Sequence, residues 1–157
     1  MNIQIKQIQN IVKNKRREKW LKDPLIKKFL LIDPIVSDPP PNKPAFVQYF
    51  EIYLNKILVG DIKVFGDKKD LKNQIAQILI VLGESRGKGI GTKAMGIVLD
   101  KIKGIHEAVY CHVNRYNIGS IKMLRNNGFR IKKFTGNEVV LYKRLRLKKL
   151  QKASISI

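Results

Sequence analysis

The feature that most constrains the fold of this chain is a glycine-rich turn between an apolar run and a helix-forming segment. Residues Ile75–Leu82 form an apolar run of strand length, and apolar residues recur at helical spacing over about Gly91–Ile102. Gly87 and Gly89 lie between the two segments. Backbone N–H groups at a helix start have no acceptor within the helix, and glycine lets a ligand approach them closely. The turn therefore predicts a binding site for a polyphosphate anion.

Two common nucleotide-binding motifs do not explain this turn. A P-loop places a lysine between its last glycine and a serine or threonine, but here Gly91 is followed directly by Thr92. A Rossmann unit opens a doubly wound sheet, whereas this turn comes late in the chain, after a run of strands that read as antiparallel. The anion site therefore belongs to another fold.

The rest of the chain predicts one domain over residues 1–147, because 157 residues suit a single hydrophobic core. Alternating and apolar runs predict strands over Asn2–Ile8, Phe46–Leu54, Leu58–Phe65, Ile75–Leu82, Ala108–Val113, Phe129–Phe134 and Val139–Leu145. Apolar spacing predicts helices over Lys13–Leu31 with a break at Pro24, over Gly91–Ile102 and over Gly119–Asn126, with loops at Ser37–Pro44 and Gly66–Asn73. The fold class is α/β of the α+β-like kind: a mostly antiparallel sheet of six or seven strands flanked by helices.

Positive charge dominates the composition, since 32 Lys and Arg face 12 Asp and Glu for a formal net charge of +20. Such an excess attracts nucleic acid, an anionic membrane or a phosphorylated cofactor, and it repels cationic molecules. An AT-rich base composition is an equally good explanation. Residues 148–157 predict a basic C-terminal tail. A basic cluster near this end either contacts RNA or the ribosome or is simply solvated: Lys143, Arg144, Arg146, Lys148, Lys149 and Lys152.

Cysteine and histidine are scarce. The single Cys111 excludes an internal disulfide framework and a cysteine-based zinc site, which indicates a reducing, cytoplasmic setting. His106 and His112 have no neighbouring ligand set, so we expect no metal. The N-terminus has no apolar core of signal-peptide length, and nowhere do ~18 apolar residues run together. We therefore expect no contact with a membrane.

Two motifs give the chain a family resemblance. The segment Arg86–Gly91 resembles the [QR]-x-x-G-x-[GA] motif of the GNAT superfamily of N-acetyltransferases. Asn117–Ser120, leading to Asn127–Phe129, is similar to that family's N-x-x-[SA] helix that ends in G-F. The resemblance covers about Phe46–Leu145. In addition, Trp20–Pro24 resembles the W-x-x-D-P stretch of the branch that acetylates ribosomal proteins and polyamines.

The resemblance implies a fold, a co-substrate and a set of binding residues. Strands Ile75–Leu82 and Ala108–Val113 would be parallel and splayed, and acetyl-CoA would bind between them. Leu79, Ile80 and Val81 would meet the pantetheine and acetyl group, Arg86, Gly87, Lys88, Gly89, Ile90, Gly91 and Thr92 the pyrophosphate, and Asn117 the pantetheine arm. A free backbone N–H near Val81 would polarise the thioester carbonyl. An amine would attack acetyl-CoA directly in a ternary complex, so Cys111 is not needed as a nucleophile.

The sequence identifies the residues that would transfer protons less clearly than those that would bind acetyl-CoA. His112 falls where some family members that acetylate ribosomal-protein termini carry a glutamate, and strand alternation turns it away from Cys111, toward the expected cleft. It is a candidate base, although a lone strand histidine also commonly has only a structural role. Leu124 occupies the slot of the family's usual thiolate-protonating tyrosine. Ser120 is then a candidate donor, or merely a helix-start hydroxyl; Tyr110, Tyr116 and solvent are the alternatives.

The acceptor is expected to be a primary amine. The charge favours a protein N-terminus or a ribosome-associated substrate over an aminoglycoside or polyamine, which needs an acidic pocket. The alternative from another class is a noncatalytic module that binds CoA or RNA. Five acids lie near the expected acceptor side, with Glu51 as the favoured one: Asp23, Asp33, Asp38, Glu51 and Asp61. Trp20 is expected to pack in the core or to line the acceptor site.

Overall fold

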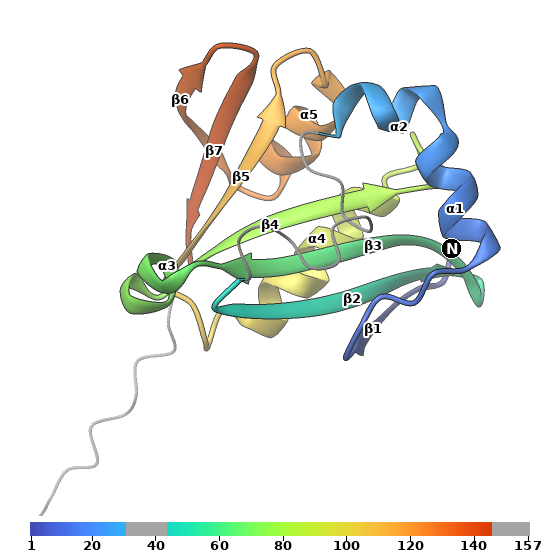
Figure 1. Ribbon diagram of the computed structural model, residues 1–157, viewed down its shortest axis with the longest axis horizontal. Coiled ribbons are helices and arrows are strands. Elements are labelled where there is room, and N and C mark those ends of the chain that lie inside the picture. The colour runs from blue at the N-terminus through green and yellow to red at the C-terminus, as the bar shows by residue number, and fades with distance from the viewer. Residues whose placement is uncertain (31–43, 146–157) are drawn as a thin grey trace, which may run out of the picture.

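A seven-stranded sheet forms the centre of the molecule (Figure 1). This computed structural model describes residues 1–30 and 44–145. The strands are β1 (Ile3–Ile8), β2 (Phe46–Leu54), β3 (Ile57–Gly66), β4 (Ile75–Leu82), β5 (Ala108–Asn114), β6 (Arg130–Thr135) and β7 (Glu138–Arg144). Their order is β1-β2-β3-β4-β5-β7-β6, and every neighbouring pair is antiparallel except β4 and β5. The predicted fold class is therefore confirmed.

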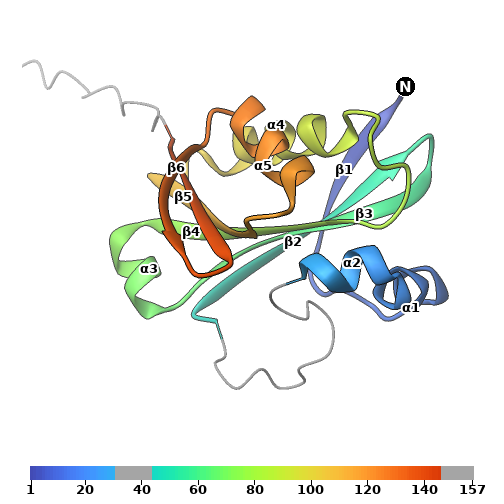
Figure 2. The same ribbon diagram turned by 90° about the horizontal axis from the view of Figure 1, so that it is seen from above.

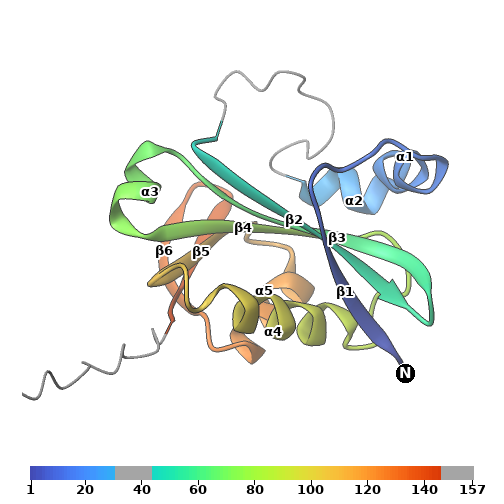
Figure 3. The ribbon, with the colours of Figure 1, turned by 90° about the horizontal axis from the view of Figure 1, so that it is seen from below.

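Helices cover both faces of this sheet. They are α1 (Lys15–Lys22), α2 (Pro24–Phe29), α3 (Lys68–Asn73), α4 (Ile90–Ile102) and α5 (Ile118–Asn126). Seen from above and from below, α4 and α5 lie on one face, while α1 and α2 lie on the other (Figures 2 and 3). None of the helices in the described part of the chain has the length and apolar character needed to cross a membrane.

The main core lies between the sheet and α4. The helix buries Ala94, Met95, Val98 and Ile102 on one side, as its apolar spacing predicts. Alternate residues of the strands meet this side, as the alternation of side chains along a strand requires. The core-facing strand residues include Phe50, Ile52, Ile62, Val64, Ala76, Ile78, Val109, Cys111, Val113, Val139 and Leu141.

A smaller apolar cluster holds α1 and α2 on the opposite face. Trp20, Ile26 and Val81 are its buried members. Asp23 separates the two helices because its side chain accepts a hydrogen bond from Leu25 N–H and so caps α2, with Pro24 in the first turn. The two helices therefore form a bent cover over the end of β4.

One expected loop is a helix. Residues 66–73 were predicted to be irregular, but Lys68–Asn73 forms α3, which a reciprocal capping box of Asp67 and Asp70 stabilises. The helix buries none of its residues, so the apolar periodicity that reveals other helices is missing. The proline-rich loop before Pro44 and the basic tail 148–157 lie outside the described residues.

Candidate active site

Strands β4 and β5 form a fork. They pair only from Ile75 with Ala108 to Gln77 with Tyr110, and then separate, as the splayed ribbons show (Figure 1). Beyond Gln77 and Tyr110 the facing edges of the two strands have no sheet partner among the described residues, so the predicted splay is confirmed.

The register of β3 and β4 shows which groups of β4 face the gap. Gly83 N–H donates to the Val59 carbonyl at 2.8 Å, and hydrogen-bonded pairs alternate along an antiparallel ladder. Val81, opposite Asp61, therefore bonds toward β3. The backbone groups of Ile80 and Leu82 point the other way, toward β5. The free N–H expected near Val81 thus belongs to these two neighbours.

The glycine-rich turn after β4 is open and rich in unpaired N–H groups. Gly87 and Gly89 have φ of 79° and 75°, and Gly89 caps α4 without any side-chain hydrogen bond. A side chain built on either glycine would meet nothing within 4 Å. The N–H groups of Ile90, Gly91 and Thr92 have no acceptor within α4 and lie at the positive end of its dipole. This geometry fits a pyrophosphate.

Arg86 has a different partner from the one expected. Its guanidinium lies 2.6 Å from the carboxylate of Asp23, the residue that joins α1 to α2. The pair is partly exposed, with about a third of each side chain accessible, so it adds little stability on its own. It links the W-x-x-D-P segment to the turn. The assignment of Arg86 to the pyrophosphate remains a prediction.

The packing of Trp20 on Gly83 also holds the Trp20–Pro24 segment against the end of β4. A Cβ on Gly83 would overlap the Trp20 indole, so only glycine allows the ring to lie there. The indole Nε1 donates to Glu84 at 3.0 Å, and the Arg16 guanidinium donates to both oxygens of that carboxylate at 2.7 Å. Sequence reasoning missed Gly83 and Glu84. The sequence clue to them is that a glycine and an acid stand between the apolar run Ile75–Leu82 and the motif that begins at Arg86.

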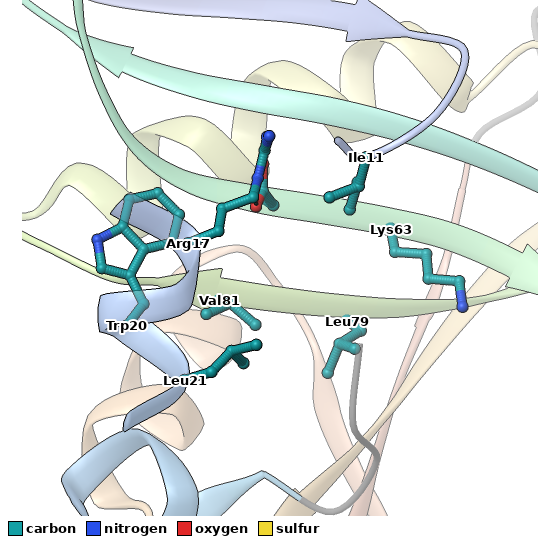
Figure 4. A pocket seen from close by; sticks show the side chains of 8 residues that line it. Ile11, Arg17, Trp20, Leu21, Lys63, Leu79 and Val81 are labelled. Atoms are coloured by element: carbon teal, nitrogen blue, oxygen red, sulfur yellow. Dashed lines mark hydrogen bonds and ion pairs between the residues drawn. The ribbon is translucent and has the colours of Figure 1, made fainter. Parts of the chain in front are cut away.

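A small cavity lies on the α1 side of the sheet, beside the fork (Figure 4). Its wall consists of Ile11, Arg17, Trp20, Leu21, Asp61, Lys63, Leu79 and Val81. Trp20 packs in a core, as expected, with 3% of its surface exposed, and it also lines this cavity; its contact with an acceptor stays a prediction. Of the residues expected to meet the acetyl group, Leu79 and Val81 face this cavity, whereas Ile80 packs against the main core.

Arg17 neutralises the acids near this cavity. Its Nε and Nη2 donate to the two oxygens of Asp61 at 2.8 and 2.6 Å, and Nη2 also donates to Glu51 at 2.8 Å. The Tyr53 hydroxyl donates to the other Glu51 oxygen at 2.7 Å. The hydrogen bond with Asp61 raises the pKa of Arg17 above its ordinary value. Glu51, the acid favoured for acceptor binding, is therefore occupied within the protein.

His112 stands on the same face of the sheet as this cavity, as the alternation of β5 predicts. Its Nδ1 lies 3.1 Å from Oε2 of Glu138 on β7, and its ring meets Tyr110 edge-on at 5.6 Å. About a third of each side chain of the His–Glu pair is accessible. Cys111 faces the core instead, where burial raises the pKa of its thiol to about 12. The thiol is thus a poor nucleophile.

The second motif begins α5 beside the fork. Asn117 caps the helix, and its side-chain oxygen accepts the Ser120 N–H at 3.2 Å. The cap is therefore Asn117, and the Ser120 hydroxyl is not the group that starts the helix. Leu124 is 1% exposed and belongs to the main core. Of the two tyrosines considered as acids, Tyr110 donates to Asp70 at 3.1 Å and Tyr116 is 64% exposed.

No group of three or more metal-ligating side chains comes together in residues 1–30 and 44–145. His106 is buried and stacks on Phe46 with ring centroids 5.2 Å apart, and it stands two residues before β5, at the paired end of the fork. Its position gives it a packing role.

Comparisons with known proteins agree with the fork and the turn. The model of the acetyltransferase (GNAT) family matches residues 5–129. No curated protein matches the chain significantly. A domain from Methanocaldococcus jannaschii shares the fold with a TM-score of 0.69 and 26% identity, over 92% of this chain and 99% of that chain.

Two further solved structures are similar in fold. RimL, a ribosomal alpha-N-protein acetyltransferase in complex with coenzyme A, has a TM-score of 0.56 and 16% identity, over 64% of this chain and 63% of that chain. Spermidine N-acetyltransferase from Vibrio cholerae, in complex with CoA and spermine, has a TM-score of 0.55 and 18% identity, over 63% of this chain and 66% of that chain. The family match over most of the chain, together with the fork and its glycine turn, shows that this protein belongs to the GNAT family of acetyltransferases.

Proposed function

We propose that this GNAT acetyltransferase transfers the acetyl group of acetyl-CoA to a primary amine, with a protein N-terminus as the preferred acceptor. The observation that carries this proposal is the fork itself. Its α4 side ends in an open turn of N–H groups, and its α1 side opens beside a cavity lined by side chains. Such an arrangement lets a thioester enter from one side and an amine from the other.

The turn and the β4 edge supply the groups for the co-substrate. The pyrophosphate would accept hydrogen bonds from the N–H groups of Ile90, Gly91 and Thr92, with Lys88 adding positive charge. The pantetheine arm would extend along the open edge of β4 toward Asn117. A thioester carbonyl beside Ile80 or Leu82 would accept a backbone N–H there, which would stabilise the oxyanion of the transition state.

The chemistry proposed is direct transfer. The lone pair of a neutral amine attacks the thioester carbon, the C–S bond breaks, and CoA leaves as a thiolate. His112 takes the amine proton at Nε2, directly or through a water molecule, because Glu138 occupies Nδ1. Ser120 or solvent returns a proton to the thiolate.

The charges around the cavity support a protein acceptor over a polyamine. A polyamine needs free carboxylates, whereas Asp61 and Glu51 are both bonded to Arg17. The net charge of +20 also repels a polycation at long range. A polyamine or aminoglycoside acceptor remains the second candidate, and a noncatalytic CoA- or RNA-binding module the third.

A single assay separates these candidates. The protein is incubated with acetyl-CoA and a panel of N-terminal peptides, polyamines and aminoglycosides, while released CoA thiol and product mass are followed. We expect acetylated peptides. Acetylated polyamine alone would select the second candidate, and tight RNA or CoA binding without any turnover would select the third.

A further inference from the structure

The small cavity on the α1 side of the sheet is lined by one charged group, Lys63, that has no ion-pair partner among the described residues. The ammonium of Lys63 lies 4.6 Å from the centre of the Phe65 ring, and no carboxylate among residues 1–30 and 44–145 forms an ion pair with it. The other charged groups of the cavity wall, Arg17 and Asp61, are bonded to each other. Within the described part of the chain, the ammonium of Lys63 therefore has no ion-pair partner.

Lys63 lies on β3, next to the part of β4 where we propose that the acetyl group and the acceptor meet. It pairs with Leu79 in the register of β3 and β4, and both residues line the cavity. Figure 4 shows Lys63 at the end of this cavity away from Trp20. The last β4–β5 pair is Gln77 with Tyr110; Leu79 and His112 each lie two residues beyond it, where the strands separate. Lys63 and His112 thus flank Leu79 on one face of the sheet.

The spacing between these two groups sets the size of an acceptor that touches both. Adjacent strands lie ~4.8 Å apart, so the backbones of Lys63 and His112 are separated by roughly 10 Å or more where the strands splay. The ammonium of Lys63 faces the ring of Phe65, two residues farther along β3. An acceptor that touches both groups therefore needs its amine and its anion several bonds apart, which fits a peptide N-terminus with a carboxylate in its first two residues.

The surroundings of Lys63 favour an anionic ligand. Burial lowers the pKa of Lys63, because removing water disfavours the charged form. A carboxylate bound beside Lys63 at the edge of the cavity would give the ammonium a partner and gain a charge-assisted hydrogen bond. A neutral side chain of the same shape gains much less.

We propose that Lys63 recognises a carboxylate of the acceptor, so that the preferred acceptors are peptide N-termini with an acidic side chain in the first two residues. This inference rests on the proposed function, since it concerns the same site.

The test compares matched peptides that differ only in Asp against Asn at the first or second position. In the wild type we expect kcat/KM to be roughly tenfold higher for the acidic peptide. Lys63→Met should bring this ratio close to one, and Lys63→Arg should retain most of it. Lys101→Met, which removes an exposed lysine on α4, is the matched control and should keep the wild-type ratio.

The outcomes are distinct. Equal rates for the two peptides in the wild type, or a preference that survives Lys63→Met, would overturn the role of Lys63 while leaving the transfer reaction intact. Absence of turnover with every peptide would overturn the proposed function and this inference together. If Lys63→Met fails to fold, Lys63→Gln takes its place, because it keeps a polar side chain without the charge and should likewise bring the ratio close to one.

Discussion

Nδ1 of His112 lies 3.1 Å from Oε2 of Glu138, and this contact joins the strand at the fork to the strand beside it. A carboxylate on Nδ1 holds that nitrogen as the donor and leaves Nε2 as the acceptor. It also fixes the direction in which the ring faces. The pair therefore gives a partly exposed histidine a defined tautomer on the acceptor side of the sheet.

Replacing His112 tests whether it is the base. We expect His112→Ala to lower kcat at neutral pH by about a hundredfold or more, because general bases typically contribute that much. The dissociation constant for acetyl-CoA should stay near that of the wild type, because the imidazole lies away from the glycine turn. Equal turnover in both proteins would remove His112 from the mechanism.

Glu138 should act through His112. Glu138→Gln keeps the size of the side chain but removes the carboxylate that fixes the tautomer and direction of the ring, so kcat should fall by less than in His112→Ala while acetyl-CoA binding is unchanged. In the double variant, the glutamate change should have no further effect on kcat, because its only route to the reaction is gone. Additive losses would mean that Glu138 has a separate role.

The sequence predicted the turn and α4 well because both depend on neighbouring residues. The apolar spacing of Ala94 and Val98, and the glycines before them, carry their signal within a short window. The His112–Glu138 contact and the Arg86–Asp23 pair depend on register and helix docking between segments 26 and 63 residues apart. No local pattern shows which partners such docking brings together, so Glu138 was missed and Asp23 was considered for the acceptor instead.

The open turn gives a direct test of co-substrate binding. Gly89→Val should weaken binding of CoA, because a branched side chain would stand where the pyrophosphate must approach the N–H groups of α4. Gly136→Val is the matched control: its glycine also has positive φ and open space around it, but it lies in the turn between β6 and β7. Both variants lose stability from backbone strain, by roughly 1–2 kcal/mol. Equal CoA affinity in the two variants would contradict the assignment of the turn.

The contact between Trp20 and Gly83 can be tested by replacing the glycine. Gly83→Ala should push the indole away and loosen α1, with a loss of about 1–3 kcal/mol from overpacking. Trp20 is the single tryptophan and is 3% exposed, so its fluorescence should shift to longer wavelength. Gly104→Ala, at a site with open space, should leave the spectrum unchanged. An unshifted spectrum in Gly83→Ala would show that α1 is not fixed there.

His106 should make the stability of the fold depend on pH. Its ring is buried against Phe46, and its Nε2 is buried without a hydrogen-bond partner in the described part of the chain. Burial lowers the pKa of His106 below the ordinary value of 6.5. Between the two values the unfolded chain binds more protons than the folded one, so stability is full above pH 6.5 and falls as the pH drops toward the folded value.

His106→Phe removes both the titration and the unpaired nitrogen while it keeps an aromatic ring against Phe46. Thermal or urea unfolding at several pH values should therefore show a flatter dependence below pH 6.5 than in the wild type. The slope lost is at most about 1.4 kcal/mol per pH unit for one proton. The chain has only two histidines, and His112→Gln, which changes the partly exposed one, should leave most of the wild-type slope in place. If His112→Gln flattens the curve and His106→Phe does not, the buried ring is not the group whose protonation unfolds the protein.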